Sequence, residues 1–307
     1  MIENWAEVVA DRIVGRHPFR QGKLLLLGAI DTGKTTLLGA LVNRLARRRP
    51  VAVVDADIGQ SHIGPPATVG WTVVEESGGR AVPTDPERPL ERVNSARPAR
   101  GTPPGGIAFV GDVTPLGHLL QLTAALALCV EQAQRAAAVV LIDTPGLVEG
   151  GAACELWWTV QRWLRPERIV AVQRQDELRE LLGGLQAGLS EIEIVETPAQ
   201  LRRKSPEARQ AHRRRLFEEY FREAAAWALS LRHLAVRSAQ RITPDNVAGR
   251  LAGLSDDAGQ DLAVGVIERW QPRRARMTIR TPQLDTDRVR CLTIGNVRMD
   301  APLGWSG

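Results

Sequence analysis

The sequence predicts an α/β fold: a parallel sheet with helices on both faces, followed by a small β-rich C-terminal domain. Apolar runs of strand length alternate with amphipathic helical segments over the first two thirds of the chain, which is the pattern of βαβ units. One of these runs enters a glycine-bounded loop and a helix at residues 24–36. After residue 229 the runs become short and alternating, which indicates β-strands separated by turns.

The loop after the first apolar strand carries the most specific signal. Gly28, Gly33, Lys34 and Thr35 match the pattern G-x-x-x-x-G-K-[ST] of a phosphate-binding P-loop. Its backbone N–H groups surround a polyphosphate, the lysine reaches the β- and γ-phosphates, and the hydroxyl reaches Mg²⁺. The helix that follows favours an anion at its N-terminus. We therefore expect a P-loop NTPase whose nucleotide lies on Gly28, Ala29, Ile30, Asp31, Thr32, Gly33, Lys34, Thr35 and Thr36.

Composition restricts the class of protein. The 307 residues are 44% hydrophobic, enough for a packed core, and no apolar run reaches the roughly 18–20 residues of a membrane span. The first residues are acidic and lack the basic start of a signal peptide, so we expect a cytoplasmic protein without a membrane partner. The three cysteines have no C-x-x-C spacing and the five histidines no metal-ligand spacing, which argues against zinc and disulfides.

The charge of the chain has two interpretations. A net charge of +5 suits an acidic partner such as nucleic acid. However, Lys23, Lys34 and Lys204 are the only lysines, so 37 of the 40 basic residues are arginine, and a GC-rich genome explains that bias equally well. Where the charges cluster is therefore more informative than their total.

The expected elements follow the alternating pattern. The N-terminal part, residues 1–20, contains a short amphipathic helix. A P-loop domain is expected over residues 21–225 and a β-rich domain over residues 226–307. In the P-loop domain we expect strands at 23–28, 51–57, 106–111, 138–142, 168–173 and 191–196, and helices at 36–49, 119–135, 154–164 and 177–185. Residues 76–106 indicate loops around short strands. Further strands are expected at 229–236, 261–267, 277–281 and 289–294.

Two carboxylates at strand ends complement the P-loop. Asp57 ends the strand after the P-loop helix, and we interpret it as the base or orienting group for an acceptor, with possible metal contact. Asp143 ends another apolar strand in the Walker B manner. Thr35, Asp57 and Asp143 are therefore the candidate magnesium ligands. A structural turn or helix cap is the alternative for Asp57.

Asp143-Thr144-Pro145-Gly146 also fits the D-x-x-G γ-phosphate sensor of GTPases. A guanine-specific protein normally adds an N-K-x-D loop after a later strand. Lys204 is the only lysine after Lys34 and lies in Arg-Lys-Ser-Pro, so guanine recognition of that type is absent.

A basic segment follows the last strand of the P-loop domain. Residues 202–215 include a run of cations that could form a mobile lid over the transferred phosphate, within about 198–221. A solvated charged helix face is the alternative.

Read together, five motifs resemble one family, the P-loop polynucleotide 5′-hydroxyl kinases. This family includes the RNA kinase of the eukaryotic pre-mRNA cleavage complex, the pre-ribosomal RNA processing kinase and archaeal relatives. The motifs are residues 28–36, 55–60, 109–118 and 143–146, and the segment with Lys204, Ser205, Arg209, Tyr220 and Phe221. The resemblance covers roughly residues 20–300.

The resemblance implies ATP-dependent phosphorylation of a 5′-hydroxyl end of RNA or DNA. It implies that Lys34 and Thr35 bind phosphate and Mg²⁺ and that Asp57 serves the acceptor hydroxyl. Lys204 and Arg209 would be the lid cations. On the substrate side the candidates are Gln60, Asp112 and Thr114.

This chain departs from the family at three sites. Lys204 replaces the usual first lid arginine, Asp112-Val113 replaces a Ser-Thr pair, and Leu147 replaces the base-stacking tryptophan of the eukaryotic enzymes. The resemblance also implies the compact form of the family, and we do not expect the large N-terminal β domain of those enzymes. Two alternatives stay open: a non-kinase P-loop ATPase that acts in assembly or processing, and a kinase for a small hydroxyl substrate. Protein partners are not predicted.

Overall fold

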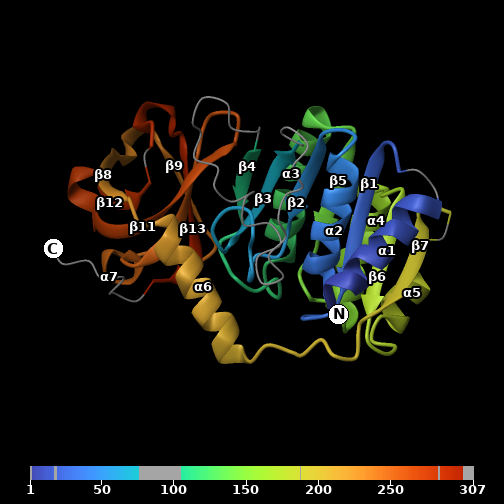
Figure 1. Cartoon of the computed structure of the whole chain (residues 1–307). Coiled ribbons are helices and arrows are strands. Elements are labelled where there is room, and N and C mark those ends of the chain that lie inside the picture. The colour runs from blue at the N-terminus through green and yellow to red at the C-terminus, as the bar shows by residue number, and fades with distance from the viewer. Residues whose placement is uncertain (1, 17–18, 76–104, 187, 283, 300–307) are drawn as a thin grey trace.

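A computed structural model describes residues 2–16, 19–75, 105–186, 188–282 and 284–299 (Figure 1). The loops and short strands predicted between residues 76 and 106 lie almost entirely outside these described residues. Among the described helices, none is long and apolar enough to cross a membrane.

Five parallel strands form the centre of the fold. Their order is β7 (Glu191–Glu196), β6 (Arg168–Gln173), β1 (Gly22–Gly28), β5 (Val139–Asp143) and β2 (Val51–Asp55). The central strands β1, β5 and β2 are continuous apolar runs because both of their faces are buried. The parallel sheet that the sequence predicted is confirmed over these five strands, and their carboxyl ends meet at one edge.

Helices cover both faces of this sheet. On one face, α1 (Ile2–Arg16) packs against α2 (Lys34–Ala46), and both share a core with β1 and β2. On the other face lie α3 (Leu119–Ala136), α4 (Gly151–Leu164) and α5 (Arg179–Gly184), whose apolar residues form a second core. The expected two-sided arrangement is therefore present, and it leaves the carboxyl edge of the strands open to loops.

Two strands make the sheet mixed. β3 (Thr68–Val74) pairs antiparallel with β2, and β4 (Gly105–Phe109) pairs antiparallel with β3. The sequence analysis did not predict β3. The prediction that the strand at 106–111 belongs to the parallel alternation was wrong, because β4 is antiparallel to its neighbour. Gly70 partly explains why β3 was not predicted, because glycine is unfavourable in strands. A side chain there would collide with the carbonyl of Ile63, 2.0 Å from the position of a Cβ, so this strand requires glycine.

The C-terminal part is β-rich, as expected. Its strands are β8 (Ala225–Ser230), β9 (Ala235–Ser238), β10 (Arg250–Ser255), β11 (Asp261–Gln271), β12 (Arg276–Thr281) and β13 (Cys291–Arg298). The single strand predicted at 229–236 was wrong. The 3₁₀ turn η1 (Leu231–His233) splits it, so that β8 pairs with β12 while β9 pairs with β13. Short helical turns also occur at α7 (Pro244–Val247), η2 (Pro272–Arg274) and η3 (Thr286–Arg288).

The two parts of the chain share one sheet. Asp261 at the start of β11 pairs with Ile107 of β4, and its carboxylate accepts the N–H of Phe109 at 2.6 Å. The boundary at residue 226 falls just after β8 begins and stays a prediction.

The predicted basic helix is α6 (Pro206–Tyr220), which runs from the connection after β7 towards the C-terminal strands (Figure 1). It begins four residues later than residue 202. Ser205 caps it, accepting the N–H of Ala208 at 3.2 Å, and proline occupies the first turn. At the other end the hydroxyl of Tyr220 accepts the N–H of Val264 at 3.0 Å. The helix is therefore anchored to the C-terminal strands, with its basic residues at the P-loop end.

Candidate active site

The P-loop lies at the open edge of the sheet, between β1 and α2. Gly28 must be glycine, because a Cβ there would lie 2.4 Å from the carbonyl oxygen of Val172. Gly33 turns the chain into the helix with a φ of 93°, which also favours glycine. The buried ammonium of Lys34 donates to the carbonyls of Gly28 at 2.8 Å and Ala29 at 2.9 Å. Lys34 thus stabilises the conformation of the loop on which the phosphates are predicted to bind.

Asp143 faces the P-loop helix from the end of β5. Its carboxylate accepts the hydroxyl of Thr35 at 2.7 Å and the N–H of Thr144 at 3.0 Å. Burial raises the pKa of Asp143 to about 6, although the charge of Lys34 opposes that shift. A hydroxyl and a carboxylate are hard oxygen ligands, and Mg²⁺ commonly uses one or two carboxylates together with substrate phosphates. The Thr35–Asp143 pair therefore fits magnesium at a bound triphosphate.

Asp57 lies in the loop after β2. Its Oδ1 accepts the N–H groups of Gly59 and Gln60, both at 3.1 Å, which closes a tight turn. Burial raises the pKa of Asp57, while the nearby Lys34 cation lowers it. Both Asp57 and Asp143 contribute to the electrostatic environment of Lys34, so the three charges share one site. Asp57, the predicted base or orienting group for the acceptor hydroxyl, is thus close to Lys34, the predicted phosphate-binding lysine.

Asp55, two residues earlier, has a structural role in this loop. It accepts N–H groups from Asp57 at 3.0 Å and from Ile63 at 3.1 Å, and a third from His62. Its strand register places it beside Asp143, and burial raises its pKa well above the usual range. Asp55 therefore shapes the turn that presents Asp57.

The predicted substrate-side residues lie on two loops that meet. A Cβ on Gly59 would lie 2.8 Å from the carbonyl oxygen of Val113, so the loop after β4 rests against the Asp57 turn. In that loop Asp112 accepts the N–H of Thr114 at 3.1 Å. The amide nitrogen of Gln60 is buried and has no hydrogen-bond partner in the described part of the chain. The structure brings these candidates together, and their roles stay predictions.

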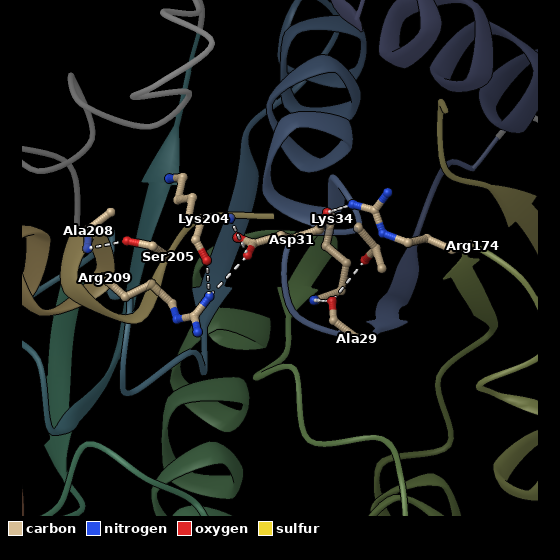
Figure 2. A network of polar contacts seen from close by, with 9 residues as sticks. Ala29, Asp31, Lys34, Arg174, Lys204, Ser205, Ala208 and Arg209 are labelled. Atoms are coloured by element: carbon tan, nitrogen blue, oxygen red, sulfur yellow. Dashed lines mark hydrogen bonds and ion pairs between the residues drawn. The ribbon is translucent and has the colours of Figure 1, made fainter. Parts of the chain in front are cut away.

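Asp31 connects the P-loop to the predicted lid. Its carboxylate accepts the N–H of Lys204 at 2.9 Å and pairs with the guanidinium of Arg209 at 3.2 Å (Figure 2). Arg209 also donates to the carbonyl of Lys204 at 2.6 Å. The side chain of Lys204 points away from Lys34, so the two lid candidates differ in placement (Figure 2). Arg209 is held at the P-loop, whereas Lys204 contributes its backbone.

Replacing Asp31 by asparagine should loosen this connection. Asparagine tolerates the φ of 59° at this position but removes the negative charge that holds Arg209. We expect trypsin to cleave the Arg202–Arg209 segment several-fold faster in Asp31→Asn than in the wild type. Glu218→Gln is the matched control, because it breaks an exposed ion pair with Arg214 on the same helix. Equal cleavage of the two variants would show that the Asp31 contact does not restrain the segment.

His62 and His212 form a second contact between the Asp57 loop and α6, with ring centroids 6.1 Å apart. Burial lowers the pKa of His62 to about 4, and the charges of His212 and Lys204 act in the same direction. His62 is therefore neutral in the folded protein at neutral pH.

This shift predicts a pH dependence of stability. The unfolded chain protonates His62 near pH 6.5, but the folded chain does so only near pH 4, so acid favours unfolding. Between these values His62 should lower the free energy of unfolding by on the order of 2 kcal/mol, with no contribution above pH 7. Urea titrations of wild type and His62→Gln should converge in acid. The stability of the exposed His233→Gln variant should depend on pH as that of the wild type does. A His62→Gln variant with the pH dependence of the wild type would contradict the prediction.

One part of the open edge was not anticipated. A cavity of about 400 Å³ lies after β6 and is lined by Glu149, Arg174, Gln175, Asp176, Glu177 and Arg203. Arg174 donates to the carbonyl of Asp31 at 2.6 Å, which places the cavity beside the P-loop (Figure 2). None of the predicted site residues lines it. The signal available in the sequence was the polar run 173–177 directly after an apolar strand.

Comparison with known proteins identifies similar chains. Residues 28–223 match the family model described as "mRNA cleavage and polyadenylation factor CLP1 P-loop". A polyribonucleotide 5′-hydroxyl-kinase of Pyrococcus furiosus is 24% identical, with 91% of this chain and 88% of the relative aligned. One of Thermococcus kodakarensis is 26% identical, with 90% and 88% aligned. One of Methanocaldococcus jannaschii is also 26% identical, but only 54% of its length is covered.

Solved structures agree on the fold. The Clp1p chain of a Clp1p–Pcf11p complex superposes with a TM-score of 0.68 at 11% identity, covering 96% of this chain and 79% of that one. A second structure of the same pair, which concerns ATP loss in a Gly135Arg mutant, gives the same TM-score at 12% identity. At these identities the likeness concerns the fold alone.

Proposed function

Because the chain belongs to the P-loop family of the mRNA cleavage and polyadenylation factor CLP1, we propose that it is an ATP-dependent polynucleotide 5′-hydroxyl kinase. One observation carries the proposal: a half-buried acceptor-side carboxylate, Asp57, shares a site with the phosphate-binding Lys34 and the Thr35–Asp143 pair. Similarity to archaeal polyribonucleotide 5′-hydroxyl-kinases along most of the chain supports the same reaction.

In the proposed reaction, the oxygen of the 5′-hydroxyl attacks the γ-phosphorus of ATP. The bond between that phosphorus and the β–γ bridging oxygen breaks, and ADP leaves with the electron pair. Asp57 accepts the proton of the hydroxyl, and Lys34 offsets charge on the phosphates. Thr35 and Asp143 would hold Mg²⁺, which supplies further charge neutralisation when bound.

The segment at about 198–221 is proposed as the lid. Arg209 is the cation best placed to reach a γ-phosphate, because its present partner Asp31 belongs to the P-loop. A bound triphosphate would compete with Asp31 for the guanidinium, which pairs with phosphate through two N–H groups. Lys204 fits the same role less well, since its side chain points away from Lys34 in the structure (Figure 2).

The acceptor in this proposal is a nucleic acid with a 5′-hydroxyl end, RNA or DNA. Gln60, Asp112 and Thr114 are the proposed contacts, and the unpartnered amide of Gln60 supports a polar ligand at that position. The archaeal relatives are named for polyribonucleotides, which favours RNA as the first acceptor to test.

A non-kinase role in assembly or processing is the second candidate. Two departures from the family pattern favour it. Lys204 points away from the P-loop, and Leu147 packs partly buried against the core instead of offering an aromatic ring to a base. A protein of this type would bind ATP without transferring phosphate.

Transfer from γ-labelled ATP to matched acceptors separates these functions. We expect labelling of 5′-hydroxyl single-stranded RNA, single-stranded DNA or nicked duplex, and little competition by free nucleosides. Efficient labelling of nucleosides would instead indicate a small-molecule kinase. ATP binding with no labelled acceptor would support the assembly role.

A further inference from the structure

We propose that the cavity after β6 holds the nucleobase of the phosphate donor and accepts guanine, with Asp176 as the group that recognises the base edge. GTP would then serve as a donor alongside ATP. The inference rests on the proposed kinase function only for the reaction that follows binding.

The position of the cavity fits a nucleobase. β6 runs parallel to β1, and Val172 lies in register with Gly28, so residues 173–177 leave the sheet beside the P-loop. Arg174 then donates to the carbonyl of Asp31 at 2.6 Å, which attaches this loop to the phosphate-binding loop. A volume of about 400 Å³ lies within the range of small-ligand pockets. A nucleotide with phosphates on the P-loop can therefore place its base here.

The carboxylates of the cavity have different roles. Glu177 accepts the N–H of Arg174 at 2.8 Å and of Gln175 at 2.9 Å, so its oxygens shape the loop. Asp176 pairs with Arg179 at 2.9 Å, but their side chains are 64% and 81% exposed. An exposed pair of this kind contributes little stability. Of these two carboxylates, Asp176 is thus the one that can exchange its partner for a ligand.

The chemistry of that carboxylate favours guanine. Guanine presents its N1–H and its 2-amino group side by side, and a carboxylate accepts both. Adenine presents an acceptor nitrogen beside its amino group, so the same carboxylate gains one hydrogen bond and meets a lone pair. The guanidinium planes of Arg174 and Arg203 line the same cavity and can stack on a base.

The local sequence supports this reading. The expected lysine of an N-K-x-D loop is absent, but Gln173-Arg174-Gln175-Asp176 offers an amide, a cation and a carboxylate at the corresponding places. The cation contacts the P-loop backbone. The amide oxygen of Gln173 is buried without a partner in the described residues. Arg174 thus occupies the position that lysine has in an N-K-x-D loop.

The test compares binding of ATP, GTP and xanthosine triphosphate by calorimetry, followed by transfer to 5′-hydroxyl RNA. We expect GTP to bind within tenfold of ATP, or more tightly. In Asp176→Asn, GTP affinity should fall at least tenfold, xanthosine triphosphate affinity should rise by a similar factor, and ATP affinity should change less than threefold. An asparagine amide donates to the 2-oxo group that xanthine has in place of the amino group.

Arg179→Ala and Glu180→Gln are the controls: the first removes the present partner of Asp176, and the second changes an exposed carboxylate in the first turn of α5, outside the cavity. Neither substitution should weaken the binding of GTP. The inference would be overturned if the wild type binds ATP but not GTP. It would also be overturned if Asp176→Asn changes the affinity for all three nucleotides by the same factor. Failure of transfer with intact nucleotide discrimination would count against the kinase function instead, because binding is measured separately.

Discussion

Replacing Lys34 by alanine should reduce transfer of the γ-phosphate at least 10³-fold, which corresponds to about 4 kcal/mol of transition-state stabilisation. The ammonium is buried between the P-loop carbonyls of Gly28 and Ala29, so no other cation can take its place without rearrangement. The variant also loses the two hydrogen bonds that hold the loop. Initial rates with γ-labelled ATP and a 5′-hydroxyl RNA measure the effect.

Lys23→Ala is the matched control, since Lys23 lies in β1 at the opposite end from the P-loop. It should retain activity within about twofold. Circular dichroism melting of both variants separates loss of folding from loss of the phosphate grip. A Lys34→Ala protein that is folded and keeps more than a tenth of the activity would contradict the assignment of this loop.

Replacing Asp57 by asparagine should lower kcat by about 10²- to 10⁴-fold, the usual contribution of a positioned base. Asparagine keeps an oxygen that can accept the N–H groups of Gly59 and Gln60, so the turn should survive while the basic carboxylate is lost. ATP affinity should change by less than threefold. Single-turnover rates together with calorimetric ATP binding distinguish these two effects.

Asp11→Asn serves as the control for removing a carboxylate, because Asp11 pairs with Arg44 on the surface of α1 and α2. It should leave kcat unchanged. A kcat within threefold of wild type in Asp57→Asn would exclude Asp57 as the base and return it to the structural alternative, a turn residue.

Local patterns explain why much of the site was predictable. The P-loop, Asp57 and Asp143 each lie at or within a few residues of the end of a buried apolar strand, and parallel strands bring their carboxyl ends to one edge. Asp57 and Asp143 therefore lie close to Lys34, as the expected order of strands predicts. The roles of these residues await the experiments above.

Features that depend on distant contacts were not predictable from the sequence. The pairing of Asp31 with Arg209 joins residues 178 positions apart, and no periodicity encodes it. Likewise, the split of the predicted strand 229–236 depends on pairing with β12 and β13, which lie far along the chain. β3 was missed because its Gly70 is dictated by packing against Ile63, a tertiary constraint that overrides strand propensity.

Transfer of label from γ-labelled ATP to a defined RNA end directly tests the proposed 5′-hydroxyl kinase activity. Two RNAs of identical sequence, one with a 5′-hydroxyl and one with a 5′-phosphate, are incubated with wild type and Lys34→Ala. A 5′-hydroxyl kinase that depends on Lys34 should label only the 5′-hydroxyl RNA, and only as wild type, and a 5′-phosphatase should remove the label. ATP binding with no labelled RNA, or equal labelling by Lys34→Ala, would contradict this proposal.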